Sequence, residues 1–480
     1  MKKTKIVSTL GPASNNLKII SALIRNGINV ARFNFSHGDH DEHAHRMSLA
    51  HQAEKKTGKL IGFMLDTKGA EIRTTAQDTP DGTISFKEGD KVRIGMDESN
   101  RAKGNKKKIF VTYKGLYDDV NTGGKILFDD GLIESTILEK DAKAHELVIR
   151  IDNDGVLGGK KGVNAPGVSI NLPGITEKDR SDIEFGLEQG IDFIAASFVR
   201  KKQDVLDIRK LIRKHHAENH VLIFPKIESQ EGIDNFKSII SVSDGLMVPR
   251  GDMGVEIPYQ EVPTTQVKMI RYLNKIGKPV ITATQMLDSM IENPRATRAE
   301  INDVESAVWD GTDATMLSGE TANGNWPVEA ARTMSVADKY AEKYVGKYGN
   351  RVNVGKEIRP TYTELIAQAA VSAAEQARAK VIVASTTSGY TARLLAKYKP
   401  SVPIIAITYN ELTARSLTIN YAVYPLVQNA PKTTDALISL AKKNILDRKL
   451  AKKGDTIVVT AGLPIEKPGT TNLVHVLKLT

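Results

Sequence analysis

Short apolar segments recur along this chain, with room for one helix between most of them. Eight such segments lie outside one central interruption, at residues 5–10, 29–35, 60–65, 192–198, 221–224, 245–248, 279–282 and 313–317. Helical patterns follow many of them, as at residues 16–25, 39–55 and 203–215. Eight alternating strand–helix units are what a closed (β/α)₈, or TIM, barrel needs, so the sequence predicts an α/β fold built on that barrel.

The alternation breaks between residues 70 and 164. Strand-like segments there are separated by turns such as Pro80-Asp81-Gly82 and Asp129-Asp130-Gly131, which favours a small inserted β domain. After about residue 346, strand and helix patterns alternate again and predict an open, mostly parallel α/β sheet. The expected domains are a barrel at 1–69 and 165–345, an insert at 70–164 and a C-terminal domain at 346–480.

Composition narrows the function classes. The 480 residues are 40% hydrophobic and 26% charged, an ordinary globular balance that suits about three domains. There is no cysteine, which excludes disulfides and thiol chemistry. The start lacks the apolar core of a secretory signal, and we expect a cytoplasmic protein with no membrane span. The net charge of +10 comes with 5% aromatic residues and no basic–aromatic repeat, which favours anionic metabolites over nucleic acid as partners.

Chemically active residue types gather where the predicted strands end. The fifth and sixth strands run into Lys226, Glu228, Arg250 and Asp252. Other strand ends carry polar residues of the same kind, namely Arg32, Asn34, Ser36, His37, Asp66, Thr67, Ser197, Thr284, Ser318 and Glu320. In a (β/α)₈ barrel the carboxyl ends of all strands share one rim, where active sites lie, so the pattern predicts a catalytic rim.

Glu228 and Asp252 suggest a metal site on that rim. Hard divalent cations take carboxylate oxygens, so both residues can ligate one cation if their strands are neighbours. Lys226 would then place a point charge beside the metal. Two structural ion pairs are the alternative interpretation of the same residues.

Several longer motifs resemble one family. TKIVSTLGPAS, ARFNFSHG, LDTKGAEIRT, KKGVNAPG, SFVRK, PKIES, RGDMGVEIP, ATQML and MLSGETANG occur in the order and spacing of the pyruvate kinases. The resemblance runs from end to end and implies a barrel, an inserted lid domain and a C-terminal regulatory domain. Three positions depart from the common pattern, Ala70, Ala165 and Pro249, and none of them removes a charged or ligand group.

The resemblance implies transfer of a phosphoryl group from phosphoenolpyruvate to ADP, a reaction that depends on charge neutralisation and positioning. Mg²⁺ or Mn²⁺ would bind Glu228 and Asp252, and Lys226 would neutralise the migrating phosphoryl group and the enolate. Arg32 and Arg73 would clamp phosphate. The remaining implied roles are substrate carboxylate binding by the amides of Gly251 and Asp252, and proton delivery through water near Thr284.

Two further sites on the barrel and lid follow from the resemblance. Asn34, Ser36, Asp66 and Thr67 would bind K⁺, with a hydrogen-bonded turn as the alternative. The nucleotide would contact Arg32, His37, Arg73 and Lys161, although Lys161 could also be a plain surface charge. We expect the nearby His40 and His43 to be solvated helix residues.

The C-terminal region carries a hydroxyl-rich loop that opens a helix, a place where free N–H groups and the helix dipole attract phosphate. Its residues are Thr386, Thr387, Ser388, Gly389 and Thr391. An ordinary helix cap is the alternative, and the resemblance favours a site for a sugar phosphate or nucleotide activator, closed by a second loop at 468–472. The family also implies a homotetramer.

Two other function classes fit parts of the sequence. A metal-dependent aldolase on a similar barrel would also stabilise a pyruvate enolate, but it would not need the insert, Lys161 or the K⁺ oxygens. A nucleic-acid binder would fit the positive charge, but no motif for base readout is present.

Overall fold

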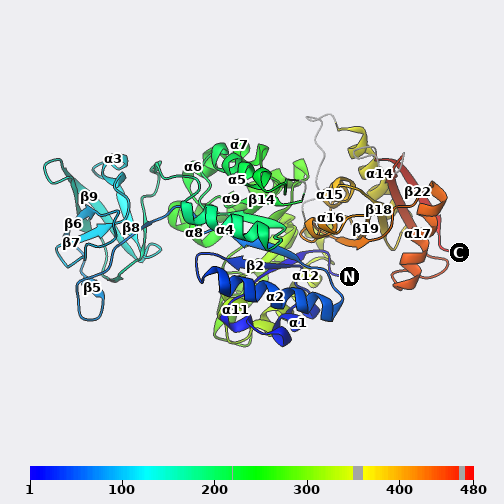
Figure 1. Cartoon of the computed structure of the whole chain (residues 1–480), viewed down its shortest axis with the longest axis horizontal. Coiled ribbons are helices and arrows are strands. Elements are labelled where there is room, and N and C mark those ends of the chain that lie inside the picture. Colours follow the sequence, from blue (N-terminus) through cyan, green and yellow to red (C-terminus); the bar gives the residue numbers. More distant parts are fainter. Residues whose placement is uncertain (219, 350–359, 464–470) are drawn as a thin grey trace.

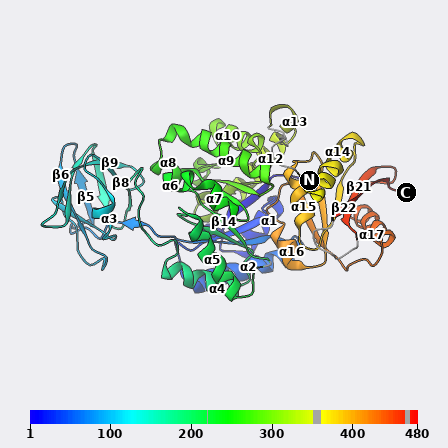
Figure 2. The same ribbon diagram turned by 90° about the horizontal axis from the view of Figure 1, so that it is seen from above.

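The computed structural model describes residues 1–218, 220–349, 360–463 and 471–480. It places three bodies in a row, with the β-rich insert at one end, the barrel in the middle and the C-terminal α/β domain at the other end (Figure 1). The same order is visible from above (Figure 2). None of the helices in the described ranges is long and apolar enough to cross a membrane.

Eight parallel strands form the barrel. They are β1 (Lys5–Thr9), β2 (Val30–Asn34), β3 (Gly62–Asp66), β13 (Phe193–Ala196), β14 (Leu222–Pro225), β15 (Leu246–Pro249), β16 (Val280–Ala283) and β17 (Ala314–Leu317). Their order is β14-β13-β3-β2-β1-β17-β16-β15, and a parallel bridge between Lys226 and Met247 joins the two ends. The predicted eight-stranded barrel is therefore confirmed.

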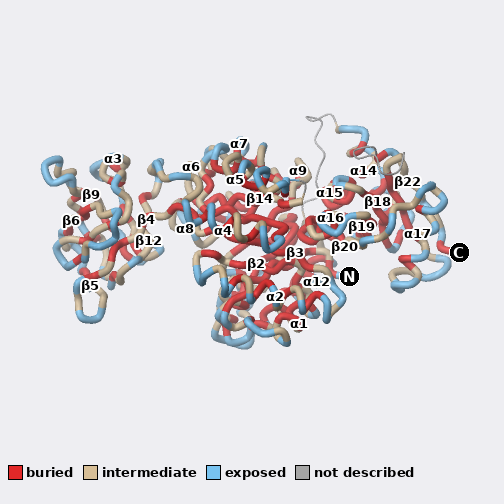
Figure 3. Tube along the Cα trace, viewed as in Figure 1, coloured by how far each residue is buried: buried red, intermediate tan, exposed pale blue. Residues whose placement is uncertain are grey.

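Helices surround these strands, whose residues are almost all buried (Figure 3). The longer ones are α1 (Leu17–Asn26), α2 (His40–Thr57), α4 (Glu177–Glu188), α5 (Lys202–Lys214), α9 (Val262–Ile276), α10 (Arg298–Asp310) and α12 (Pro327–Ala341). The shorter ones are η1 (Pro12–Ser14), α6 (Gln230–Asp234), α7 (Phe236–Ser241), α8 (Arg250–Glu256), η2 (Tyr259–Glu261), η3 (Asp288–Ile291), α11 (Gly319–Ala322) and α13 (Val345–Tyr348).

Helix α1 shows how the sequence specifies this layer. Asn16 caps its first turn, and Ile20, Leu23 and Ile24 recur at helical spacing and are completely buried against the barrel. Gly27, with φ of +110°, ends the helix in a left-handed conformation that favours glycine.

The insert folds around a hydrophobic core of its own, which includes Ile94, Ile109, Phe128 and Ile149. Its seven-stranded sheet has the order β4 (Ile72–Arg73), β12 (Gly162–Asn164), β8 (Lys125–Phe128), β9 (Ile133–Asp141), β10 (Glu146–Ile151), β6 (Lys91–Met96) and β7 (Lys108–Val111). A second sheet pairs β5 (Thr83–Phe86) with β11 (Gly155–Gly158), and α3 (Leu116–Asp119) lies between strands in the chain. The predicted inserted β domain is confirmed.

The C-terminal sheet has the order β20 (Val423–Val427), β19 (Ile404–Thr408), β18 (Ile382–Ser385), β21 (Thr456–Gly462) and β22 (Thr471–Lys478). Its helices are α14 (Tyr362–Gln376), α15 (Tyr390–Lys397), α16 (Glu411–Ser416) and α17 (Thr434–Asp447). Four strands are parallel and the edge strand β22 is antiparallel, as an open, mostly parallel sheet requires. The domain rests on the amino end of the barrel, where Arg415 of α16 pairs with Glu54 of α2 at 3.0 Å.

Candidate active site

A cleft of about 430 Å³ lies between the carboxyl ends of the barrel strands and the insert. Residues from both sides line it, including Arg32, Asn34, Ser36, His37, Glu71, Arg73, Lys161, Lys226, Glu228 and Asp252. The structure therefore brings most of the predicted site residues together around one cavity. Asp66, Thr67, Gly251 and Thr284 are not among the lining residues.

Lys226 lies at the centre of the barrel side of this cleft. Its Nζ donates to Ser197 Oγ at 2.9 Å and to Asp66 Oδ1 at 3.4 Å, and it lies 3.0 Å from Glu228 Oε1. Burial alone would lower the pKa of Lys226, but Asp66, Glu228 and Asp252 together raise it above its usual value. The ammonium is therefore charged and fixed in place, with 9% of the residue exposed.

Glu228 is a buried carboxylate with unused acceptor capacity. Its Oε2 accepts a hydrogen bond from the Phe198 amide, whereas Oε1 meets Lys226 as an ion pair and accepts no well-directed hydrogen bond from the described residues. Burial raises the pKa of Glu228 to about 7, with Asp252 adding to the shift and Lys226 opposing it. Such an oxygen is suited to a cation that would replace the missing hydrogen bond.

Asp252 supplies the second carboxylate from the first turn of α8 and is exposed in the cleft. Across the described ranges, no group of three or more acidic, histidine or cysteine side chains could enclose a metal. A site built on Glu228 and Asp252 would thus leave most coordination positions to substrate and water, as is usual for Mg²⁺.

Arg32 and Asp66 form a buried ion pair beside Lys226. Arg32 Nε donates to Asp66 Oδ2 at 2.6 Å and its Nη1 donates to Thr9 Oγ1 at 2.7 Å. Burial would raise the pKa of Asp66, but Arg32 and Lys226 hold it below its usual value. Asp66 thus remains charged and anchors both cations at the cleft.

The four residues predicted for K⁺ come from two adjacent strand ends, since Asn34 and Asp66 pair across β2 and β3. Asn34 and Ser36 line the cleft, and Asn34 Oδ1 accepts from the Ser36 amide at 3.2 Å. Thr67 Oγ1 accepts from the Ser197 amide at 3.0 Å, and Ser197 Oγ donates to the Thr67 carbonyl at 2.6 Å. The oxygens have the right chemistry for a monovalent cation, but those of Asp66 and Thr67 already accept hydrogen bonds from the protein.

Gly251 and Thr284 contact each other rather than the cavity. The Gly251 amide donates to Thr284 Oγ1 at 2.8 Å, and that hydroxyl donates to the Ala283 carbonyl at 2.7 Å. One of the two amides predicted to bind a substrate carboxylate, that of Gly251, is therefore already hydrogen-bonded in this structure. Thr284 has a φ of +68°, an uncommon backbone conformation for a β-branched residue.

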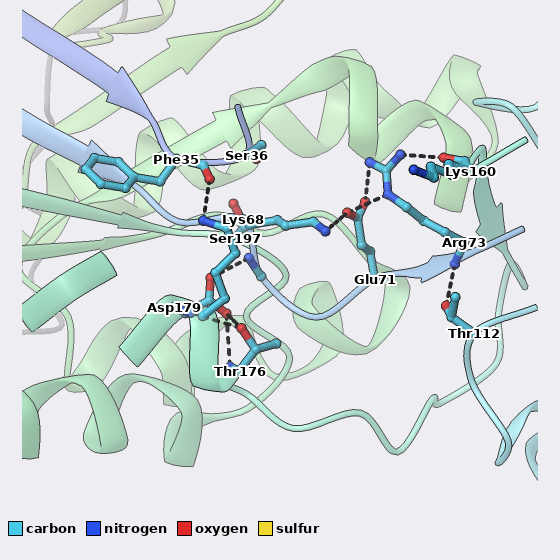
Figure 4. A network of polar contacts seen from close by, with 12 residues as sticks. Phe35, Ser36, Lys68, Glu71, Arg73, Thr112, Lys160, Thr176, Asp179 and Ser197 are labelled. Atoms are coloured by element: carbon cyan, nitrogen blue, oxygen red, sulfur yellow. Dashed lines mark hydrogen bonds and ion pairs between the residues drawn. The ribbon is translucent and has the colours of Figure 1, made fainter. Parts of the chain in front are cut away.

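The insert contributes cations to the opposite wall. Arg73 donates hydrogen bonds to both carboxylate oxygens of Glu71, at 2.7 and 2.9 Å, and to the Lys160 carbonyl at 2.7 Å. Lys68 also reaches Glu71, at 3.3 Å, so this carboxylate lies between two cations (Figure 4). Lys161 pairs with Asp129 at 3.0 Å, a contact that a bound anion would have to replace.

Comparison with known families matches nearly the whole chain. A model described as the pyruvate kinase barrel domain matches residues 1–331, and one described as the pyruvate kinase alpha/beta domain matches residues 364–477. The chain belongs to the pyruvate kinase family.

Proteins named pyruvate kinase are similar over almost all of this chain. The protein named pyruvate kinase from Lactobacillus delbrueckii subsp. bulgaricus is 53% identical over 478 residues, covering 98% of this chain and 80% of the relative. Those from Geobacillus stearothermophilus and Bacillus licheniformis are 50% and 48% identical, each covering 99% of this chain and 80% of the relative. These matches do not support the aldolase alternative.

Pyruvate kinases use Mg²⁺ and K⁺, and both predicted cofactors are consistent with the oxygen-rich rim described above. The divalent cation fits Glu228 Oε1 and Asp252, because Oε1 is buried with no directed hydrogen bond from any described residue and the Asp252 carboxylate is open to the cleft. Asn34 and Ser36 line the cavity, so K⁺ would reach their oxygens from it.

The prediction that His43 is solvated is wrong. His43 is 1% exposed, stacks on Phe35 with ring centres 3.9 Å apart, and its Nε2 contacts the His37 carbonyl at 2.9 Å. Burial lowers its pKa, so it is neutral near pH 7. His40 is partly exposed, but it pairs with Asp182 at 2.9 Å and stacks on Phe185.

The hydroxyl-rich loop of the C-terminal domain also has the predicted form, a strand end followed by a helix. Gly389 adopts φ of +80° at the N-cap of α15, and no side chain of the described residues caps this helix. Thr391 Oγ1 contacts Thr471 Oγ1 at 2.5 Å, so the start of β22 meets the loop; of the predicted second loop at 468–472, residues 468–470 lie outside the described residues.

Arg393 is a residue of this loop region that sequence reasoning missed. Its Nη2 donates to the Ser388 carbonyl at 2.7 Å, while its Nη1 is buried without a partner among the described residues. A basic residue one turn into the helix after the loop was the available signal.

Proposed function

We propose that this chain catalyses phosphoryl transfer from phosphoenolpyruvate to ADP, forming ATP and pyruvate. The observation that carries this proposal is the fixed Lys226 ammonium, 3.0 Å from Glu228 and flanked by Arg32 and Asp252 at one end of the cleft. A preorganised cation facing the charge that develops during transfer is among the strongest contributors to catalysis.

The residues have separable roles. Glu228 and Asp252 would hold Mg²⁺ or Mn²⁺, which supplies charge neutralisation to substrate oxygens when bound. Lys226 and Arg32 stabilise the phosphoryl group as the bond to the enol oxygen breaks and the bond to the ADP oxygen forms. Lys226 then stabilises the enolate left behind.

The enolate must gain a proton at its methylene carbon to give pyruvate. Thr284 is the proposed positioning group for that proton, through water, because a hydroxyl is too weak an acid to act alone. Its contact with the Gly251 amide supports a link between substrate carboxylate binding and this step.

Nucleotide binding is assigned to the opposite wall. Arg73 and Lys161 on the lid, with His37 and Arg32 on the barrel, would bind the phosphates of ADP. Their positions around one cavity support this assignment. Asn34, Ser36, Asp66 and Thr67 are the proposed K⁺ ligands.

Regulation is proposed from the contacts of the C-terminal loop. The loop of Thr386, Thr387, Ser388, Gly389 and Thr391 would bind the phosphate of a sugar or nucleotide activator. Within the described part of the chain, the start of α15 has no side-chain cap and Arg393 Nη1 has no hydrogen-bond partner, which supports this proposal. We also propose that the chain forms a homotetramer and acts in the cytoplasm. The proposed domain boundaries lie at 69/70, 164/165 and 345/346.

A coupled assay of ATP formation tests it, with phosphoenolpyruvate, ADP, Mg²⁺ and K⁺, and with or without sugar phosphates. We expect turnover that requires both substrates and the divalent cation. Pyruvate formation that is independent of ADP would contradict phosphoryl transfer to the nucleotide.

A further inference from the structure

The lid is connected to the barrel by two chain segments, and one carboxylate holds both. The outgoing segment passes Gly69 and the returning segment ends at Thr176, the N-cap of α4. Asp179 in the first turn of α4 is 2% exposed. Its Oδ1 accepts from the Gly69 amide at 2.9 Å, and its Oδ2 accepts from the Thr176 amide at 3.0 Å and from Thr176 Oγ1 at 2.6 Å.

The bond to Gly69 is not needed to cap the helix. A capping box needs only the reciprocal contacts between Thr176 and Asp179, and these use Oδ2 and the Asp179 amide. Oδ1 is thus available for the distant segment, 110 residues earlier in the chain. A buried carboxylate with both oxygens hydrogen-bonded to backbone is costly to disturb.

We call the hydrogen bonds of Asp179 to Gly69 and Thr176 the clasp. The segment at Gly69 that it holds is also packed against the wall of the active site. Gly69 has φ of +74°, and a Cβ there would lie 2.8 Å from Phe198 and 2.9 Å from Ser197, which hydrogen-bonds Lys226. Glu71 and Arg73 follow within four residues and line the cleft (Figure 4). The position of Gly69 therefore fixes the backbone from which the side chains of Glu71 and Arg73 extend into the cleft.

The same helical turn holds a second active-site loop. Lys178 Nζ donates to the Phe35 carbonyl at 2.9 Å and pairs with Asp182 at 2.6 Å. Phe35 lies between Asn34 and Ser36, both of which line the cleft. The first turn of α4 is thus a common support for the lid connections and for the loop after β2.

We propose that Asp179 is a positioning residue that ties both lid connections to the barrel and so places Arg73 over the bound nucleotide. The inference rests on the nucleotide role proposed for Arg73. It predicts that loss of the clasp impairs ADP use while phosphoenolpyruvate, held by the barrel, binds normally.

The test compares Asp179→Asn with Thr176→Ala. The first variant presents an amide in place of a carboxylate to three donors. The second removes the hydroxyl of the same cap but leaves the Gly69 contact. In Asp179→Asn we expect hydrogen exchange in residues 67–73 to speed up about tenfold, and kcat/KM for ADP to fall about ten- to a hundredfold.

Thr176→Ala should lower Tm while hydrogen exchange in residues 67–73 and kcat/KM for ADP stay near wild type. Unchanged ADP kinetics in Asp179→Asn, or an equal loss in Thr176→Ala, would overturn the positioning role. If Asp179→Asn fails to fold, Asp179→Glu, which keeps the charge but moves it by one methylene, should show the same selective loss of ADP use and is judged by the same criterion.

An Arg73→Met variant separates this inference from the proposed function. Wild-type ADP kinetics in Arg73→Met would show that the nucleotide assignment of Arg73 has failed. The exchange and kinetic comparison of Asp179→Asn with Thr176→Ala still decides whether the clasp matters.

Discussion

Lys226 Nζ lies 3.0 Å from Glu228 Oε1, two residues further along the same strand end. The ammonium keeps its proton, whereas burial raises the pKa of the carboxyl to about 7. A cation at Glu228 must therefore compete with a proton near neutral pH, which makes the metal site sensitive to acid.

Replacing either proposed metal ligand should weaken Mg²⁺ activation. Glu228→Gln and Asp252→Asn each remove one of two carboxylates, so activity should fall by about two or more orders of magnitude and the half-saturating Mg²⁺ concentration should rise. In the wild type that concentration should rise as the pH falls below about 7, because protonated Glu228 binds metal poorly. An Mg²⁺ titration like that of the wild type in both variants would exclude these ligands.

Lys226→Met should separate chemistry from binding. The variant keeps the aliphatic stem and removes the charge, so kcat should fall by about a hundred- to a thousandfold. Phosphoenolpyruvate should still bind through Arg32 and the metal. The role is wrong if kcat stays near wild type while only the substrate affinity falls.

Glu71→Lys should reduce the requirement for K⁺. Glu71 is held between Lys68 and Arg73, so the substitution frees both cations and adds a third at the cleft. An ammonium there can supply the positive charge that K⁺ otherwise brings. Wild-type activity should be low in buffer without K⁺ or Na⁺, and full activity there would contradict the prediction.

The effector loop should be separable from catalysis. Alanine at Thr386, Thr387 and Ser388 should abolish activation by sugar phosphates and leave the rate at saturating substrate nearly unchanged. Arg393→Met should weaken activation as well, since Nη1 of Arg393 has no hydrogen-bond partner among the described residues and would donate to a phosphate. A wild-type response in the triple variant would place the effector elsewhere.

Asp192 should make stability depend on pH. It is 1% exposed, accepts from the Phe63 amide at 2.8 Å, and burial raises its pKa to about 7 from an ordinary 3.8. Because the folded protein then binds more protons than the unfolded chain, this residue costs stability as the pH rises from about 4 to 7.

Asp192→Asn keeps an oxygen acceptor and avoids that charge. The Tm of Asp192→Asn minus the Tm of the wild type should therefore increase as the pH rises from about 5 to about 8. The exposed Glu188→Gln is the control, with no such trend expected. Parallel Tm curves for Asp192→Asn and wild type would show that Asp192 is not the group responsible.

The barrel and its rim were predictable because each strand is an apolar run followed at once by polar residues. Lys226, Glu228 and Arg32 could be found this way, since strand ends in a closed barrel must meet. The edge strand β20 is not recognisable from its pattern, because Pro425 interrupts it, which an edge position tolerates.

Contacts between distant loops were not predictable. The burial of His43 depends on stacking against Phe35, and the Gly251–Thr284 hydrogen bond joins residues 33 positions apart. The clasp at Asp179 looks like an ordinary helix cap in sequence, since its second partner lies across the insert.

The bridge that joins the ends of the barrel sheet is made by the main chain of Lys226. Replacing this side chain leaves the main-chain bridge to β15 in place. Proline would disturb the opposite side of the strand, because it lacks the N–H that joins residue 226 to the Ala196 carbonyl of β13. Selection on the identity of residue 226 therefore acts through its ammonium, on the reaction and on the buried ion pairs with Asp66 and Glu228, and not through the bridge that closes the barrel. A descendant of this chain that lost the lysine would keep the closing bridge and lose the charge.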